Sequence, residues 1–101
     1  MDLKTKFHKD MVNIYKRAKE EAHYNATRFL QMVSEDGGLN AAKKLIAHED
    51  DSLGFEKLWE LNKLELTVEV LVLKDEYHSL FSEEEQEKCR IKLIKHGYES
   101  F

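Results

Sequence analysis

The chain contains no proline and only four glycines, the residues that most often interrupt helices and form tight turns. A fold of many short strands joined by tight turns is therefore disfavoured. The sequence also lacks any run of eighteen apolar residues, and no apolar signal segment follows Met1. We therefore expect an all-helical, cytoplasmic protein that does not insert into membranes.

A single cysteine, Cys89, leaves no internal disulfide to be formed. It stands beside Arg90 with no histidine at nearby positions in the sequence. A thiol is a good nucleophile only where it is accessible and its thiolate is stabilised by a neighbouring charge. We expect Cys89 to be a buried packing residue.

Recognisable motifs for metal or phosphate chemistry are also missing. No two of the five histidines lie one helical turn apart, and the local cluster at residues 48–51 lacks the pattern of a calcium-binding loop. Gly37 and Gly38 precede a predicted helix, but without the Lys and Ser/Thr of a phosphate-binding loop. We predict no catalytic residues, no metal ion, no cofactor and no enzymatic activity.

The chain does have enough apolar material for one core. Its 101 residues, 42% hydrophobic and 36% charged, are ordinary for a single globular domain spanning residues 1–101. Residues 53–73 hold Trp59, the only tryptophan, together with eleven leucine, valine and phenylalanine residues. We predict that this segment forms the centre of the core.

A long apolar stripe runs through the first third of the chain with a mean spacing of about 3.75 residues. Its members are Leu3, Phe7, Met11, Ile14, Ala18, Ala22, Ala26, Phe29 and Val33. A continuous helix over residues 3–33 would be about 45 Å long, which exceeds a compact domain of this size. We therefore expect it to protrude, bend or break, with the break near Asn25, where helix propensity is weak.

Further helices are predicted over residues 39–48, from a cap at Asp51 or Ser52 to residue 61, and from Ser82 to residue 96. Ser82 and Glu85 have the spacing of a capping box, and Gly97 can end the last helix. Residues 64–72 alternate like a strand, but no second strand candidate exists to pair with them. We predict a helix capped by Thr67. The alternative is a strand that pairs with a second copy in an obligate dimer.

Together these segments predict a compact all-α bundle of about five helices with a long N-terminal helix. Charge is distributed unevenly along it, because residues 1–30 and 88–101 are basic whereas residues 31–87 are acidic. Packing of the two ends against the middle would make this arrangement internally complementary. The alternative is a nucleic-acid-associated regulator that binds phosphates through its basic N-terminal helix, with Lys16, Arg17, Lys19 and Arg28 as the candidate contacts.

The aromatic residues are more numerous than the predicted core requires. Partly exposed aromatics commonly anchor protein interfaces. The interface candidates are Tyr15, Tyr24, Trp59, Tyr77, Tyr98 and Phe101. We therefore expect a small regulatory or accessory module that binds another protein, of an oligomeric state that the sequence leaves open.

Several spaced residues from Tyr15 onward resemble a small bacterial α-helical domain family of unknown function. They are Gly37 and Gly38, Ala41 and Ala42, Leu45, Gly54 and Phe55, Leu58 and Trp59, residues 66–69, Leu80 and Phe81, and Leu93, Gly97 and Tyr98. The resemblance implies a bacterial or phage setting. It brings no activity, cofactor or site residue that could be transferred to this chain.

Overall fold

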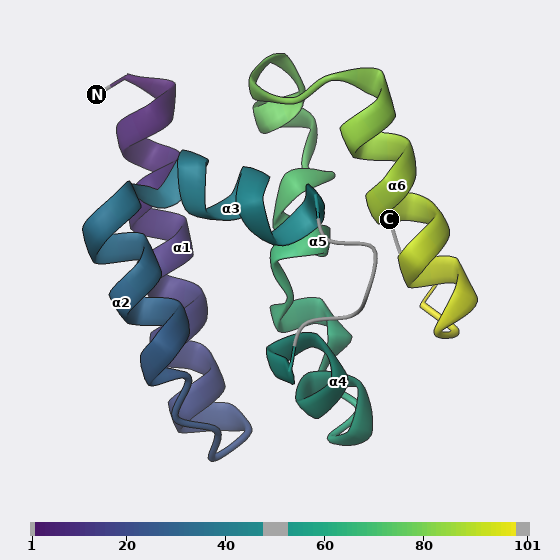
Figure 1. The fold of residues 1–101 in the computed structure, drawn as a ribbon. Helices are drawn as coiled ribbons and strands as arrows, with labels where there is room; N and C mark the ends of the chain where they lie inside the picture. Colours follow the sequence, from purple (N-terminus) through teal and green to yellow (C-terminus); the bar gives the residue numbers. More distant parts are fainter. Residues whose placement is uncertain (1, 48–52, 99–101) are drawn as a thin grey trace.

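The computed structural model describes residues 2–47 and 53–98, and within them the chain is all-helical, without strands (Figure 1). The prediction of an all-α fold is confirmed, and six α-helices with two short 3₁₀ helices are roughly consistent with the expected five. In chain order the elements are α1 (Leu3–Glu21), α2 (Thr27–Asp36), α3 (Gly38–Ala47), α4 (Leu53–Glu60), η1 (Leu64–Leu66), α5 (Val68–Val72), η2 (Asp75–Leu80) and α6 (Glu83–Lys95).

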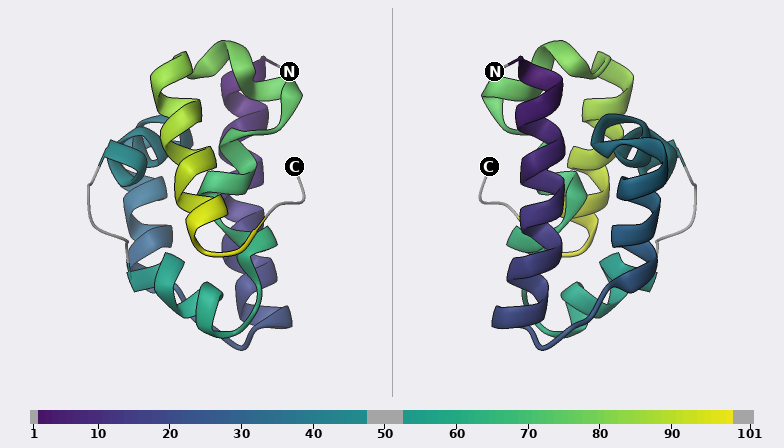
Figure 2. Two further views of the ribbon diagram at one scale, coloured as in Figure 1. Left: turned by 90° about the vertical axis from the view of Figure 1, so that its right-hand side faces the viewer. Right: turned by 90° about the vertical axis from the view of Figure 1, so that its left-hand side faces the viewer.

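The long N-terminal stripe breaks where the sequence predicts. Asp2 is the N-cap of α1, since its carboxylate accepts a hydrogen bond from the Thr5 amide at 2.8 Å, and the helix ends at Glu21. His23 adopts a positive φ of 55°, which is not helical, and α2 begins at Thr27. The chain therefore turns back, and α1 and α2 lie side by side (Figures 1 and 2).

Helix α3 crosses α1 at a very short distance. Gly37, with a φ of +84°, ends α2, and Gly38 begins α3 against the backbone of His8. A Cβ atom on Gly38 would lie 2.6 Å from the His8 Cα, so only glycine fits there without a shift of the helices. The Gly38 amide donates to the His8 Nδ1 at 2.9 Å, which gives this histidine a structural role.

The ambiguous segment at residues 64–72 is helical. The Thr67 hydroxyl accepts from the Val70 amide and donates to the Leu64 carbonyl at 2.7 Å, so Thr67 caps α5 as predicted. Leu66, Val68, Leu71 and Val72 are all buried. Because this central segment is covered on most sides, its apolar residues need no single periodicity, which explains the ambiguity of the sequence.

Helix α6 has the predicted cap at each end. The Ser82 and Glu85 amides each donate to the side chain of the other residue, at 2.9 and 3.1 Å. At the far end the Tyr98 amide donates to the Leu93 carbonyl and the Gly97 amide to the Ile94 carbonyl, with Gly97 at a φ of +87°. These bonds form a Schellman motif. The predicted caps Asp51 and Ser52 of α4 lie outside the described residues.

The largest part of the core joins the first half of α1 to α3, α5, η2 and α6. The Phe7 ring lies edge-on to Tyr77 at 4.9 Å and to Phe81 at 5.4 Å between ring centroids. The buried Tyr77 hydroxyl donates to the Asp10 carboxylate. Met11 and Cys89 are buried in the same cluster. The prediction that residues 53–73 form the centre of the core holds in part, because α5 contributes buried valine and leucine residues while α1 supplies Phe7 and Met11.

Candidate binding pocket

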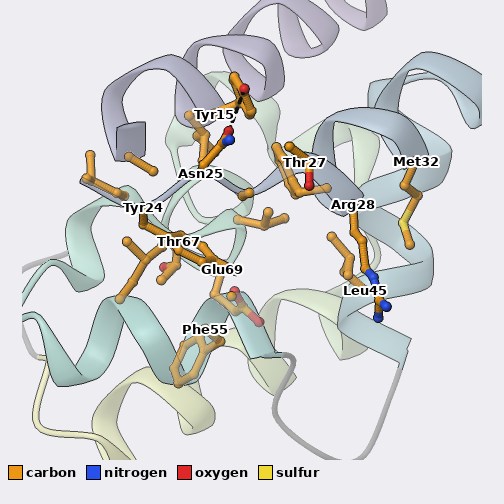
Figure 3. A pocket seen from close by; sticks show the side chains of 18 residues that line it. Tyr15, Tyr24, Asn25, Thr27, Arg28, Met32, Leu45, Phe55, Thr67 and Glu69 are labelled. Carbon is orange, nitrogen blue, oxygen red and sulfur yellow. Dashed lines mark hydrogen bonds between the residues drawn. The ribbon is translucent and has the colours of Figure 1, made fainter. Parts of the chain in front are cut away.

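A pocket of about 430 Å³ opens where the second half of α1, the start of α2, α4 and the η1–α5 segment meet (Figure 3). Ligand pockets in proteins usually have volumes of roughly 300–1,000 Å³ and mostly apolar walls. The apolar lining residues are Ile14, Ala18, Ala26, Phe29, Met32, Leu45, Phe55, Leu58, Leu66 and Val68. A cavity of this size and composition is the strongest candidate for a functional site among the described residues.

Small residues account for the space. The N-terminal apolar stripe carries large side chains at Phe7 and Met11, but small ones at Ala18 and Ala26, which line the pocket. Gly54, in the first turn of α4, adds no side chain, and the nearest atoms to a Cβ built there would be those of Tyr24, at 3.8 Å and beyond. These three positions therefore leave unfilled the volume that large side chains would occupy.

Two of the predicted interface residues border this pocket. Tyr15 and Tyr24 are both partly buried lining residues. The Tyr15 hydroxyl donates to the Asn25 Oδ1 at 2.7 Å, which ties α1 to the connection between α1 and α2. Tyr24 packs against the small cluster of Ala18, Leu58 and Leu66. These tyrosines present aromatic surface to the pocket while remaining fixed in place.

A buried ion pair lies in the pocket wall. Glu69 on α5 accepts a hydrogen bond from the Lys92 Nζ of α6 at 2.8 Å, and their side chains are 6% and 16% exposed. The same ammonium lies 4.2 Å from the centre of the Phe55 ring. The negative charge of Glu69 is therefore compensated from within the protein. The pair joins the acidic middle of the chain to its basic end, as the charge distribution predicts.

Arg28 stands in the first turn of α2 and is exposed at the pocket. In the view of Figure 3 its guanidinium projects close to Leu45, which lines the same pocket. Within the part of the chain that the structure describes, no carboxylate forms an ion pair with it. Arg28 was predicted as a nucleic-acid contact together with residues of the N-terminal helix, but the break near Asn25 places it on α2.

The other predicted interface residues have different environments. Trp59 is 48% exposed outside the pocket and lies edge-on to His96, with 4.9 Å between the ring centroids. Tyr98 is partly buried against Phe55, Leu64 and Leu93. Tyr77 is fully buried, because it fills the space beside Phe7, and it offers no surface to a partner. Phe101 lies outside the described residues.

The remaining nucleic-acid candidates lie on the exposed surface of α1. Arg17 donates to Glu21 at 2.8 Å, and this hydrogen bond raises the pKa of Arg17. Its charge is thereby partly neutralised, whereas Lys16 and Lys19 are exposed. The four predicted cations do not all belong to one helix, since α1 holds three of them and α2 holds Arg28.

Cys89 is buried in the core, and burial raises the pKa of its thiol to about 12. Such a thiol is protonated at neutral pH and is a poor nucleophile. Among the described residues, no three His, Cys, Asp or Glu side chains are arranged to hold a metal ion. The cluster at residues 48–51 lies outside that part. None of the described helices is long and apolar enough to cross a membrane.

Comparison of the chain with protein-family models, curated proteins and solved structures finds no match. The resemblance to a small bacterial domain family therefore stays a prediction, and the pocket is the feature on which a functional argument can be built. The sequence named Tyr15 and Tyr24 as interface candidates, which stays a prediction, and gave no indication of the pocket that they line. The sequence feature nearest to it is the pair of small residues Ala18 and Ala26 in the N-terminal stripe, which does not by itself show which distant side chains leave a space beside them.

Proposed function

We propose that the protein is a binding module that takes apolar side chains of another protein into the pocket between α1, α2, α4 and α5. The observation that carries this proposal is the cavity of about 430 Å³ with mostly apolar walls in a domain whose other end is densely packed. Pockets of this kind receive the buried anchor residues of protein partners. Tyr15 and Tyr24 supply the aromatic surface that such anchors contact.

The two buried polar side chains of the wall, Thr67 and Glu69, support binding rather than catalysis. Thr67 uses its hydroxyl to cap α5, and Glu69 is held by Lys92. Both side chains are thus engaged in holding the fold together. A reacting group that must exchange protons with a substrate would need an accessible atom, and these two residues are 3% and 4% exposed.

The free energy of apolar burial limits the affinity that the pocket alone can give. Full burial of two large apolar side chains supplies roughly 3–6 kcal/mol, whereas a micromolar complex requires about 8 kcal/mol. Contacts around the mouth must therefore add to the burial within the pocket. A partner segment that covers the mouth as well as filling the cavity satisfies this requirement.

Filling the pocket tests the proposal. Gly54→Leu places a side chain next to Tyr24 inside the cavity, whereas Ser34→Leu adds the same side chain to an exposed position of α2 outside the pocket lining. Short peptides would first be selected from a random displayed library on the wild-type protein. Their affinities for both variants would then be measured by isothermal titration calorimetry.

We expect Gly54→Leu to weaken the selected peptides about tenfold or more, which corresponds to about 1.4 kcal/mol, and Ser34→Leu to leave them unchanged. Circular dichroism would confirm that both variants remain helical. Peptides that bind equally well to the filled pocket would show that the protein does not use it.

Nucleic-acid binding is the second proposal, and the exposure of Lys16 and Lys19 on α1 favours it. Phosphate contacts release counterions, so affinity for DNA would fall steeply as salt rises. Replacing both lysines by glutamine would reduce the slope of that salt dependence. If the protein is not retained on a DNA column even at low salt, this alternative is wrong.

A further inference from the structure

The charges around the pocket are not balanced. Among the described lining residues, Arg28 is the single cation and Glu69 the single anion. Glu69 is neutralised by Lys92 at 2.8 Å, so the wall that holds it carries no net charge toward the cavity. Arg28 has no carboxylate partner among the described residues. The pocket thus combines an apolar interior with one exposed positive charge that no carboxylate of residues 2–47 or 53–98 compensates.

We infer that the partner segment is an amphipathic helix that carries an aspartate or glutamate next to its apolar anchors, and that Arg28 binds this carboxylate. This inference rests on the proposed function and names the chemistry of its partner. A guanidinium presents a planar fork of N–H donors that matches a carboxylate with two parallel hydrogen bonds. Arg28 is therefore a specificity-determining residue for the occupant of the pocket.

The arrangement fits a helix because side chains three and four positions apart share one helical face. Two apolar residues at that spacing enter the cavity, and an acidic residue one turn further along the same face reaches the rim. Arg28 and the apolar Leu45 both line the pocket, and in the view of Figure 3 the guanidinium projects close to Leu45. One continuous helical segment can contact both.

Selectivity for an acidic group must come from this local contact. The whole chain has a formal net charge of −4, and residues 31–87 are acidic, so the protein as a whole repels anions. A carboxylate is retained only where a nearby cation outweighs that field. The net negative charge of the chain therefore excludes a general attraction of acidic peptides, such as a basic protein would exert, and leaves Arg28 as the source of any preference for a carboxylate.

The experiment compares displayed peptide libraries selected on three proteins: wild type, Arg28→Gln, and the matched control Lys19→Gln. Lys19 is an exposed cation of α1 that does not line the pocket. We expect peptides selected on the wild type and on Lys19→Gln to share an acidic residue at a fixed spacing from two apolar residues. Peptides selected on Arg28→Gln should keep the apolar pair and lose the acidic residue.

Synthetic peptides then measure the contribution of the carboxylate. A selected peptide and its Glu→Gln isostere should differ about fivefold in affinity for the wild type, and less than about twofold for Arg28→Gln. Equal thermal unfolding midpoints of the wild type and Arg28→Gln would exclude a folding defect. Chemical-shift mapping should place the peptide against Tyr15, Tyr24 and Arg28.

The outcomes separate this inference from the proposed function. Peptides that lose affinity with Gly54→Leu but bind equally well as the Glu and Gln forms would overturn the role of Arg28 while the pocket stands. If no selected peptide responds to Gly54→Leu, the proposed function fails. Decanoate, a small acid with an apolar tail, is tested in parallel by the same calorimetry. If decanoate binds in the pocket and no peptide does, the occupant is a small amphipathic acid, and the assignment of a protein partner is wrong.

Discussion

The two ends of helix α1 lie in contrasting surroundings. At its start Phe7 and Met11 are fully buried and packed against Tyr77 and Phe81, so this end is filled by large side chains. Toward its finish the same stripe presents Ala18, and the space beside it is the pocket. Both ends have the same apolar spacing. The comparison shows that periodicity places a helix against its neighbours, whereas side-chain volume decides whether the contact becomes core or cavity.

The largest difference in the free energy of unfolding should appear between two variants that each lose one phenylalanine, one at the filled end of the domain and one at the pocket. Phe7→Ala deletes a fully buried ring that contacts two others, and we expect it to lower the free energy of unfolding by about 3–5 kcal/mol. Phe29→Ala removes a partly buried ring that lines the pocket, and about 1–2 kcal/mol is expected because it enlarges an existing space. Urea denaturation measures both. Equal losses would mean that the two ends are packed alike.

The buried ion pair should make the next largest contribution at the pocket end. Lys92→Met leaves Glu69 charged and almost fully buried without its partner, and we expect a loss of about 2–3 kcal/mol. Adding Glu69→Leu should restore a substantial part of that stability, since no unpaired charge remains. Chemical denaturation of the single and double variants gives the coupling energy. A double variant that loses the sum of both single effects would show that the pair is not coupled.

Two glycines give opposite predictions for the same substitution. Gly38→Ala puts a methyl group 2.6 Å from the His8 Cα, which must separate α1 from α3, and about 1–3 kcal/mol should be lost. Gly54→Ala meets only Tyr24 at ordinary contact distance, and the better helix former should add about 0.5–1 kcal/mol. Thermal unfolding of both variants checks the contrast. A stabilised Gly38→Ala variant would contradict the close approach of the two helices.

A smaller effect should appear in the pH dependence of the filled end. Burial raises the pKa of Cys89 to about 12, whereas an unfolded thiol titrates at about 8.5. The Cys89 thiol therefore keeps its proton to a higher pH in the folded state than in the unfolded state. Its contribution to the free energy of unfolding is complete below the unfolded pKa of about 8.5 and is lost as pH rises toward 12. We expect about 1 kcal/mol to be lost between about pH 8 and about pH 9.5.

The Cys89→Ala variant serves as the control, because it should show a shallower decline over that range. Iodoacetamide should label the wild-type thiol slowly at about pH 8 in the folded state and rapidly in denaturant. Rapid labelling of the folded protein would show that Cys89 is accessible.

Local signals in the sequence predicted the helix ends well. The capping box at Ser82 and Glu85, the cap at Thr67 and the break near Asn25 are all confirmed. Each depends on the chemistry of a few adjacent residues, such as a hydroxyl placed to accept an amide hydrogen bond. Such features are independent of the rest of the fold and can be read directly from the sequence.

Features that depend on distant contacts could not be predicted. The sequence assigns no role to His8, yet its ring accepts a hydrogen bond from the Gly38 amide, thirty residues later in the chain. Tyr77 was predicted at an interface but is buried beside Phe7. The pocket was missed for the same reason, because it forms where small residues from α1, the α1–α2 connection and α4 meet. No local pattern shows which distant positions will face each other.

The hydrogen bond between Tyr15 and Asn25 holds α1 to the connection between α1 and α2 at the edge of the pocket. It fastens the connection between α1 and α2 at 2.7 Å, and this connection is part of the rim. A typical hydrogen bond contributes only about 0.5–1.5 kcal/mol. Breaking this hydrogen bond therefore costs less than burying two large apolar side chains in the pocket releases, so this bond alone does not exclude an occupant that fits the cavity.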